Sequence, residues 1–335
     1  MAFFTTRRFL PLFITQFLGA LNDNLLKNAL VMLITYRLAT EVGNPEFLVT
    51  AAAGIFMLPF FLFSATAGEL ADKYDRAMLT RLIKLFEIGI VVVASAGFYL
   101  SHVTLLMVTL FCMGVHSTFF GPIKYALLPQ HLHNDELLAG NGYIESGTFL
   151  AILLGAILGG LLITHENGIV LISCLLIGVA ASGYTSSRFI PLAPAPDAGL
   201  AITRNIWRAT WDVLAFSKQR TGIFLCILGI SWFWLVGAAF VAQFPNYTKM
   251  TLGGDETVVT LLLATFSIGI AIGSAMCSKL LKGLITTRYV PLAAAGISLA
   301  IADLYFASHQ VVRMEDGLMG AITFIQQGGW RVVID

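Results

Sequence analysis

Nine apolar runs, each long enough to cross a lipid bilayer, recur along this chain of 335 residues. A helix rises roughly 1.5 Å per residue, so about 20 apolar residues cross a hydrocarbon core of about 30 Å. Because 57% of the residues are hydrophobic and 12% are charged, a soluble fold is excluded. The sequence therefore predicts an all-α integral membrane protein. Its expected spans are residues 9–36, 47–71, 82–100, 103–127, 141–163, 168–187, 221–244, 257–280 and 289–307.

The longest polar connection, residues 188–220, divides these spans into two groups. We expect a six-helix N-terminal bundle in residues 1–187, a cytoplasmic linker, and a partial C-terminal bundle of about three helices in residues 221–335. Helical spacing within the linker gives one polar and one apolar stripe, which predicts an amphipathic helix lying in the membrane interface. An ordinary surface linker is the alternative. The polar stripe is Arg204, Arg208 and Asp212, and the apolar stripe is Trp207, Trp211 and Leu214.

Lysine and arginine are distributed unevenly between the two sets of loops. With Lys84 and Lys124 assigned to the side of the N-terminus and Lys27 left out, that side carries fifteen basic residues and the other side four. Basic residues concentrate in cytoplasmic loops. The sequence therefore predicts a multi-pass membrane protein with a cytoplasmic N-terminus.

The first apolar run is interrupted near its middle by the polar residues Asn22, Asp23, Asn24 and Lys27. A charged side chain inside a bilayer is costly unless it faces protein, water or a counter-charge. Asp23 and Lys27 are four residues apart, on one face of a helix, where they can meet. We expect these four residues to form the substrate-binding site, with a structural ion pair between packed helices as the alternative.

The loop after the second span contains Gly68, Asp72 and Arg76. Asp72 can pair with Arg76 and accept hydrogen bonds from a helix N-terminus, which would hold one bundle to the other in one conformation. A weaker copy of the pattern begins at Gly273, 205 residues later, as expected for two halves related by a parallel repeat. Simple positive-inside anchoring is the alternative reading of these loops.

A second pair of charges, Lys124 and Glu145, lies near the inner ends of the fourth and fifth spans. We expect this pair to act as an inner gate, although a static ion pair is an equally good interpretation. Two further carboxylates, Glu87 and Asp303, lie in apolar runs. They rank below Asp23 because neither has a basic residue four positions later.

Several function classes lack their sequence signatures. The acyltransferase pattern His-x-x-x-x-Asp is absent, because Asp135 lies one position too close to His131. The chain contains no Gly-x-x-x-x-Gly-Lys-Ser/Thr phosphate loop, no Cys-x-x-Cys pair and no separate basic patch. We therefore expect no enzyme activity, no cofactor or metal, and no nucleic-acid partner.

The Gly68, Asp72 and Arg76 spacing resembles the loop motif of the major facilitator superfamily. Within it, the sequence resembles the bacterial lysophospholipid transporters, including forms fused to acyltransferase and acyl-carrier-protein synthetase domains. The segments that carry this resemblance are 16–24, 119–129 and 141–146. The resemblance implies a location in the bacterial inner membrane and inward movement of lysophosphatidylethanolamine, with lysophosphatidylglycerol as a second substrate. It also implies contact with membrane lipids and a fused or separate acyltransferase or synthetase partner.

The chain departs from the superfamily's usual twelve helices, because Gln326–Arg331 looks like the start of a tenth helix close to Asp335. We expect either a truncated chain or a partner that supplies the remaining helices. A facilitator of drugs or small metabolites and an inactive fragment are therefore alternative functions. Competition between lysolipids and soluble compounds would separate the first of these from lipid transport.

Overall fold

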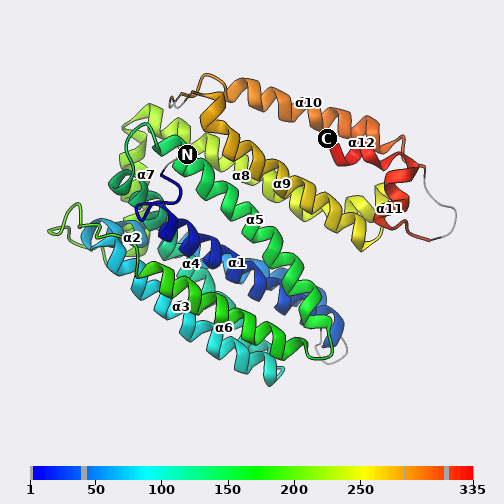
Figure 1. Cartoon of the computed structure of the whole chain (residues 1–335), viewed down its shortest axis with the longest axis horizontal. Helices are drawn as coiled ribbons and strands as arrows, with labels where there is room; N and C mark the ends of the chain where they lie inside the picture. The colour runs from blue at the N-terminus through cyan, green and yellow to red at the C-terminus, as the bar shows by residue number, and fades with distance from the viewer. Residues whose placement is uncertain (1–2, 39–43, 283, 285, 313–316, 335) are drawn as a thin grey trace. The chain divides into compact units, whose positions relative to one another are not determined.

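The computed structural model describes residues 3–38, 44–282, 284, 286–312 and 317–334. Helices dominate this part of the chain, and the β-structure recorded there is one isolated bridge between Gly254 and Met319. The all-α prediction is confirmed (Figure 1). The helices are α1 Leu10–Met32, α2 Pro45–Lys73, α3 Arg76–Tyr99, α4 Val103–His131, α5 Leu137–Thr164, α6 Gly168–Ser187, α7 Ile206–Lys218, α8 Thr221–Tyr247, α9 Glu256–Leu280, α10 Val290–Ser308, α11 Ala321–Phe324 and α12 Trp330–Ile334. Three π-helical segments accompany them: η1 Leu33–Arg37, η2 Thr248–Leu252 and η3 Ile325–Gly329.

Side chains at the helix starts explain several of these boundaries. Asn44 accepts a hydrogen bond from the backbone N–H of Phe47, and Pro45 occupies the first turn of α2. Asp75 caps α3 in the same way through the N–H of Met78, at 2.7 Å. Such caps satisfy N–H groups that have no partner within the helix, so the short polar segments between apolar runs fix where each helix begins.

Seven helices in the described part are long and apolar enough to cross a membrane: α2, α4, α5, α6, α8, α9 and α10. The remaining two predicted spans correspond to α1 and α3, which carry Asp23 and Lys27, and Lys84 and Glu87, respectively. Both α1 and α3 pack against other membrane-length helices. The charged residues that lie in the middle of α1 and α3 are thus on helices that pack against more apolar ones.

Helix α1 is held closely against α5 (Figure 1). A Cβ atom on Gly155 would lie 2.6 Å from the carbonyl oxygen of Leu21, and one on Gly159 would lie 2.7 Å from that of Leu25. Only glycine permits this backbone approach. The two glycines therefore allow α1 to pack closely against α5, while α1 also contacts α4 and α6.

The chain divides into two compact units, one of Met1–Phe216 with Ala271–Gly283 and one of Ser217–Ile270 with Leu284–Asp335. The first unit has a core of aliphatic and aromatic side chains from α1, α3, α4 and α6, including Leu26, Val91 and Leu110. The second has its own apolar cluster, which includes Phe324. Each unit therefore has an apolar core of its own.

The amphipathic stretch forms α7, as predicted, and Arg204 lies just before its first residue. Trp207 and Trp211 are exposed, while Arg208 lies 3.8 Å from Asp212 on the polar side. The ring of Trp207 contacts that of Phe61 edge-on. An exposed tryptophan stripe on a short helix is typical of a helix at a membrane surface.

Candidate functional site

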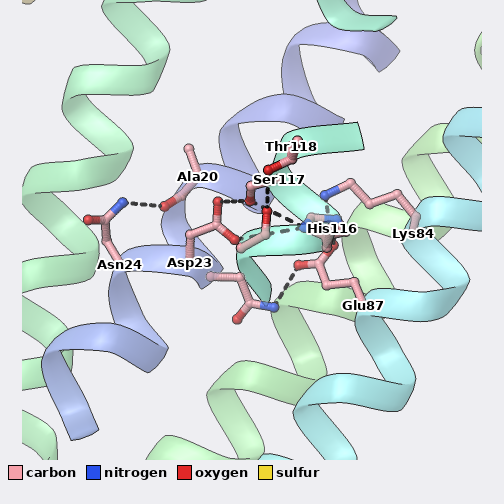
Figure 2. Close-up of polar contacts among 10 residues, drawn as sticks. Ala20, Asp23, Asn24, Lys84, Glu87, His116, Ser117 and Thr118 are labelled. Carbon is pink, nitrogen blue, oxygen red and sulfur yellow. Dashed lines mark hydrogen bonds and ion pairs between the residues drawn. The ribbon is translucent and has the colours of Figure 1, made fainter. Parts of the chain in front are cut away.

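Polar side chains from α1, α3 and α4 meet inside the first unit (Figure 2). We call this group the interior cluster; it consists of Asn22, Asp23, Lys84, Glu87, His116 and Ser117. Asn22 donates from Nδ2 to Oε1 of Glu87 at 2.7 Å. Asp23 accepts a hydrogen bond from the hydroxyl of Ser117 and its side chain is 13% exposed. Two of the four predicted substrate-binding residues therefore join three helices.

The ion pair at the centre of the interior cluster was not predicted. Lys84 donates from Nζ to Oε2 of Glu87 at 2.7 Å, and both side chains are 0% exposed. The prediction that Lys84 is one of the basic loop residues is wrong, because its side chain is buried within α3. The spacing of the two residues could have predicted this pair. They are three positions apart within an apolar run, and residues at this spacing share a helix face.

Phe120 and Gly19 accommodate the buried ammonium group of Lys84. It lies 5.2 Å from the centre of the Phe120 ring, a favourable position for a cation over an aromatic face. A Cβ atom on Gly19 would lie 2.5 Å from the same nitrogen. The glycine in α1 therefore leaves the space that the ammonium group occupies.

His116 contacts both carboxylates of the interior cluster. Its Nε2 lies 3.2 Å from Oε2 of Glu87, and its Nδ1 lies 3.8 Å from Oδ1 of Asp23. The imidazole is 1% exposed and stacks on the ring of Phe120. The sequence predicts no role for His116, because its partners Glu87 and Asp23 lie on helices distant in sequence.

The expected pair between Asp23 and Lys27 is not among the ion pairs of the described residues. Instead, Lys27 donates to Oδ1 of Asn24 at 3.1 Å and lies 5.7 Å from the ring centre of Phe56. Asn24 also donates to the carbonyl of Ala20, one turn earlier in α1. The predicted site thus separates into Asn22 and Asp23 in the interior cluster and a neighbouring Asn24–Lys27 pair.

The expected pair between Lys124 and Glu145 is also replaced by other contacts. Glu145 accepts a hydrogen bond from the hydroxyl of Tyr125, and Lys124 lies 4.8 Å from the centre of that ring. Tyr125 therefore contacts both proposed gating residues. A carboxylate held by a neutral phenol is easier to release than one held by a cation, because charge-assisted bonds are stronger.

The loop between α2 and α3 forms a second polar group, which we call the loop network: Asp72, Asp75, Arg76 and the backbone of Ala193. Arg76 donates to Asp72 at 2.8 Å, as predicted, and also to the carbonyls of Ala71 and Ala126. The N-terminal hydrogen bonds of α3 go to Asp75 rather than Asp72, because Asp75 occupies the capping position. Gly68 lies inside α2 with open space around its Cβ position.

Asp303, ranked below Asp23 from the sequence, has a partner in the second unit. Arg331 donates to both oxygens of Asp303 at 2.9 Å and also to the side chain of Gln310. The partner is 28 residues later rather than four, so helical spacing could not identify it. This pair is charge-balanced and partly exposed.

Some polar atoms of the interior cluster have no hydrogen-bond partner among the described residues. These buried atoms are Oδ1 of Asn22, Oδ1 of Asp23 and Nε2 of His116, the last despite its short distance to Glu87. Unpaired buried polar groups are rare in proteins and require an explanation. Two acceptors and one nitrogen beside an ion pair can bind a cationic group or a proton. No group of His, Cys, Asp and Glu suited to a metal ion occurs in the same part of the chain.

A shallow groove of about 560 Å³ lies elsewhere, between α1 and α6. Its lining is mostly apolar and contains none of the charged residues described above. We therefore assign the chemistry to the interior cluster and not to this groove. The residues that line it are Leu10, Pro11, Ile14, Ala181, Ser182, Thr185, Ser186 and Phe189.

Membrane-length helices that surround a group of charged side chains define a multi-pass membrane protein of the transporter class. The model of the Major Facilitator Superfamily matches residues 12–330. The chain belongs to this superfamily.

Three relatives share most of their length with the chain, and each is named lysophospholipid transporter LplT. The relative from Cronobacter sakazakii is 27% identical over 337 residues, covering 98% of this chain and 79% of the relative. The relative from Salmonella gallinarum is 26% identical, covering 97% and 77%. The relative from Escherichia fergusonii is 25% identical, covering 88% and 70%.

Proposed function

We propose that this chain carries lysophospholipids across a bacterial inner membrane by alternating access. Lysophosphatidylethanolamine is the first candidate substrate and lysophosphatidylglycerol the second. The observation that carries the proposal is Asp23, a mostly buried carboxylate whose Oδ1 has no hydrogen-bond partner in the described part of the chain. The names of the relatives support the same class of substrate.

The head group of lysophosphatidylethanolamine has one ammonium and one phosphate. Asp23 would bind the ammonium at its open oxygen, and Asn22 has a second open oxygen beside it. Lys27, one turn further along α1, would exchange its bond to the neutral Asn24 for the phosphate. Four residues of helix separate these groups by roughly 6 Å along the axis. Asp23 and Lys27 therefore offer a negative and a positive charge in the same order along α1 as the ammonium and the phosphate of the head group.

Alternating access requires contacts that break and re-form. We assign the inner gate to Lys124 and Glu145, with Tyr125 as the group that holds Glu145 when substrate is absent. Gly68, Asp72 and Arg76 would stabilise one conformation through the loop network. The N-terminal segment fits a cytoplasmic position, because Arg7 and Arg81 both donate to carbonyls that follow α6, where basic residues gather.

The physiological role would be inward movement of lysolipid for reacylation. A fused or separate acyltransferase or acyl-carrier-protein synthetase would consume the product. Contact with membrane lipids would include the exposed tryptophans of α7.

Uptake of labelled lysophosphatidylethanolamine into proteoliposomes tests the proposal. We expect uptake by the wild-type chain and uptake no greater than that of protein-free vesicles in Asp23→Asn, because the amide cannot neutralise an ammonium. Asp212→Asn makes the same chemical change on the exposed face of α7 and should leave uptake unchanged. Wild-type uptake in Asp23→Asn would contradict the assignment of the site. Absence of uptake by the wild type, with retention of the folded chain in the vesicles, would contradict the function.

A further inference from the structure

Two exposed arginines, Arg7 and Arg188, lie at the same end of the α1–α6 pair and contact only neutral groups among the described residues. Arg7 precedes α1, and its Nε donates to the carbonyl of Phe189 at 3.2 Å. Arg188 follows α6, and its Nη1 donates to the hydroxyl of Tyr184 at 3.5 Å. Neither arginine takes part in an ion pair in the described part of the chain. Two positive charges at this end of the helices are therefore not balanced by a carboxylate.

The chain segments around these arginines lack acidic residues. The first acidic residue of the sequence is Asp23, and no Asp or Glu occurs between Glu166 and Asp197. The neighbouring Arg8, by contrast, pairs with Glu136 at 3.1 Å. A guanidinium presents several N–H donors in a planar fork that matches the oxygens of a phosphate. The two arginines therefore have donors available for an anion from outside the chain.

The apolar groove of about 560 Å³ lies directly beside these charges, between α1 and α6, which pack against each other (Figure 1). Leu10 and Phe189 line one end of the groove. Arg7 lies one turn before Leu10 and donates to the backbone of Phe189, and Arg188 is the residue before Phe189. From this end the lining continues along α1 to Ile14. The groove is therefore an apolar surface with two arginines at one end.

This arrangement has the chemistry of a site for a lipid with a negatively charged head group. Sites for small molecules have volumes of roughly 300–1,000 Å³, so the groove has room for an acyl chain. Its lining is mostly apolar, and Ile14 and Phe189 are exposed on membrane-length helices, where lipid surrounds them. Basic residues beside a pocket between membrane helices are typical of binding to anionic lipid head groups.

We propose that Arg7, Arg188 and the groove between α1 and α6 bind one anionic phospholipid of the surrounding membrane. The phosphate contacts the two guanidinium groups, and one acyl chain lies in the groove. Phosphatidylglycerol has this chemistry. Phosphatidylethanolamine fits less well, because its ammonium finds no carboxylate in the segments that form the site. The bound lipid stabilises the packing of α1 against α6, since a ligand stabilises the folded state that binds it.

This lipid site is separate from the interior cluster. On α1, Asp23 follows Ile14 by about two and a half turns, which is roughly 14 Å along the helix axis. None of the residues that line the groove belongs to the interior cluster. The lipid is bound at the membrane-facing surface and is not the transported molecule. The inference therefore goes beyond the proposed function and does not depend on it.

A second groove in the same unit provides an internal comparison. It has a volume of about 460 Å³, lies between α3 and α6, and is lined mostly by apolar groups, including those of Ala96 and Tyr99. None of its lining residues, and none of their neighbours in sequence, is a lysine or an arginine. We expect acyl chains to contact this groove without a preference for the head group.

Titration of the detergent-solubilised full chain with fluorescent phosphatidylglycerol tests the proposal. We expect saturable binding of one lipid per chain and weaker binding of phosphatidylethanolamine with the same acyl chains. Arg7→Gln/Arg188→Gln should weaken phosphatidylglycerol binding about thirtyfold, the combined contribution expected of two basic residues. Glutamine keeps a donor for the carbonyl of Phe189. The matched control, Arg220→Gln/Arg288→Gln, removes the same charge from exposed positions of the second unit and should leave binding unchanged.

Two further variants test the groove without changing the charge. Ala181→Phe places a ring in the groove and should weaken phosphatidylglycerol binding, whereas Ala96→Phe places the same ring in the second groove and should not. Asp23→Asn, in the interior cluster, should leave this binding unchanged. If the double variant Arg7→Gln/Arg188→Gln does not fold, Ala181→Phe and the comparison of the two lipids still decide the outcome.

Four results would overturn the proposal. The first is the absence of saturable binding to the folded wild type, and the second is equal affinity for phosphatidylglycerol and phosphatidylethanolamine. The third is an equal loss in the two double arginine variants, which would show attraction to basic surfaces in general. The fourth is displacement of the lipid by soluble glycerol phosphate at the same concentration, which would show a site for a phosphate ion alone.

Discussion

The interior cluster and the loop network each contain an ion pair between an acidic and a basic side chain, but they differ in how completely their polar atoms are hydrogen-bonded. In the loop network, Arg76 donates through Nε, Nη1 and Nη2. Asp75 uses one oxygen to cap α3 and the other to accept the N–H of Ala193. In the interior cluster, by contrast, Asn22, Asp23 and His116 each retain an atom without a hydrogen bond among the described residues.

This difference distinguishes a network that stabilises the fold from a group that binds a ligand. A saturated network is typical of a group that holds the chain in one arrangement, because each bond that breaks leaves a buried partner unpaired. An unsaturated group in a buried site is more costly to maintain and is explained by a ligand or a proton that completes it. We therefore assign conformational stability to the loop network and binding to the interior cluster.

Breaking the buried ion pair should have the largest effect on stability. Lys84→Met leaves the buried carboxylate of Glu87 with Asn22 and His116 but without its cation, and we expect a loss of about 3 kcal/mol in the free energy of unfolding. The double variant Lys84→Met/Glu87→Gln should recover most of that loss, since no unpaired charge remains. Chemical unfolding in detergent micelles measures both. Equal losses in the single and double variants would show that the pair is not coupled.

Removing Arg76 should have the next largest effect. Arg76→Ala leaves the carbonyls of Ala71 and Ala126 without their donor, and we expect a loss of about 2 kcal/mol. The ion pair with Asp72 adds little, because the carboxylate is 55% exposed. Arg208→Ala, on the exposed face of α7, is the matched control and should change stability by less than about 0.5 kcal/mol. If Arg76→Ala lowers stability no more than Arg208→Ala does, the assignment of conformational stability to the loop network is wrong.

A smaller effect should come from the space around Lys84. Gly19→Ala places a methyl group where the ammonium nitrogen lies, 2.5 Å away, and displacing the flexible lysine should cost about 1–2 kcal/mol. Gly89→Ala, in α3, adds the same methyl group in open space and should be neutral or slightly stabilising. The cost of Gly19→Ala should fall in a Lys84→Met background. Unfolding curves of the two single variants and the double variant supply the comparison.

The smallest effect should be found at the surface, where Arg8 lies 3.1 Å from Glu136. The backbone N–H of His133 and then Arg8 hold the pKa of the Glu136 carboxyl below its usual range. A carboxyl with a lowered pKa in the folded state stabilises the fold above its unfolded pKa, and this contribution is lost as the pH falls through the folded pKa. Glu136→Gln should cost less than about 1 kcal/mol near neutral pH. Thermal unfolding between neutral and acidic pH should show the difference from wild type disappearing in acid.

The sequence by itself determined the class of fold and the position of the polar residues inside the first span. Apolar runs of spanning length require membrane helices, because backbone polar groups in lipid must be paired within the helix. The charged Asp23 within such a run requires an interior partner, and the spacing of Asp72 and Arg76 predicts their pair. These are local properties, set by neighbours three or four residues away in the chain.

Only the tertiary structure decided which side chains meet Asp23. Its partners Ser117 and His116 come from α4, and His116 in turn contacts Glu87 of α3. These contacts depend on the rotation of each helix about its axis and on the glycine contacts that hold α1 against α5. Sequence spacing suggested Lys27 for Asp23 and left Lys84 in a loop, whereas packing placed Lys84, Glu87 and His116 together. The physical reason is that helices in lipid are apolar on nearly every face, so their sequence pattern carries little information about which face turns inward.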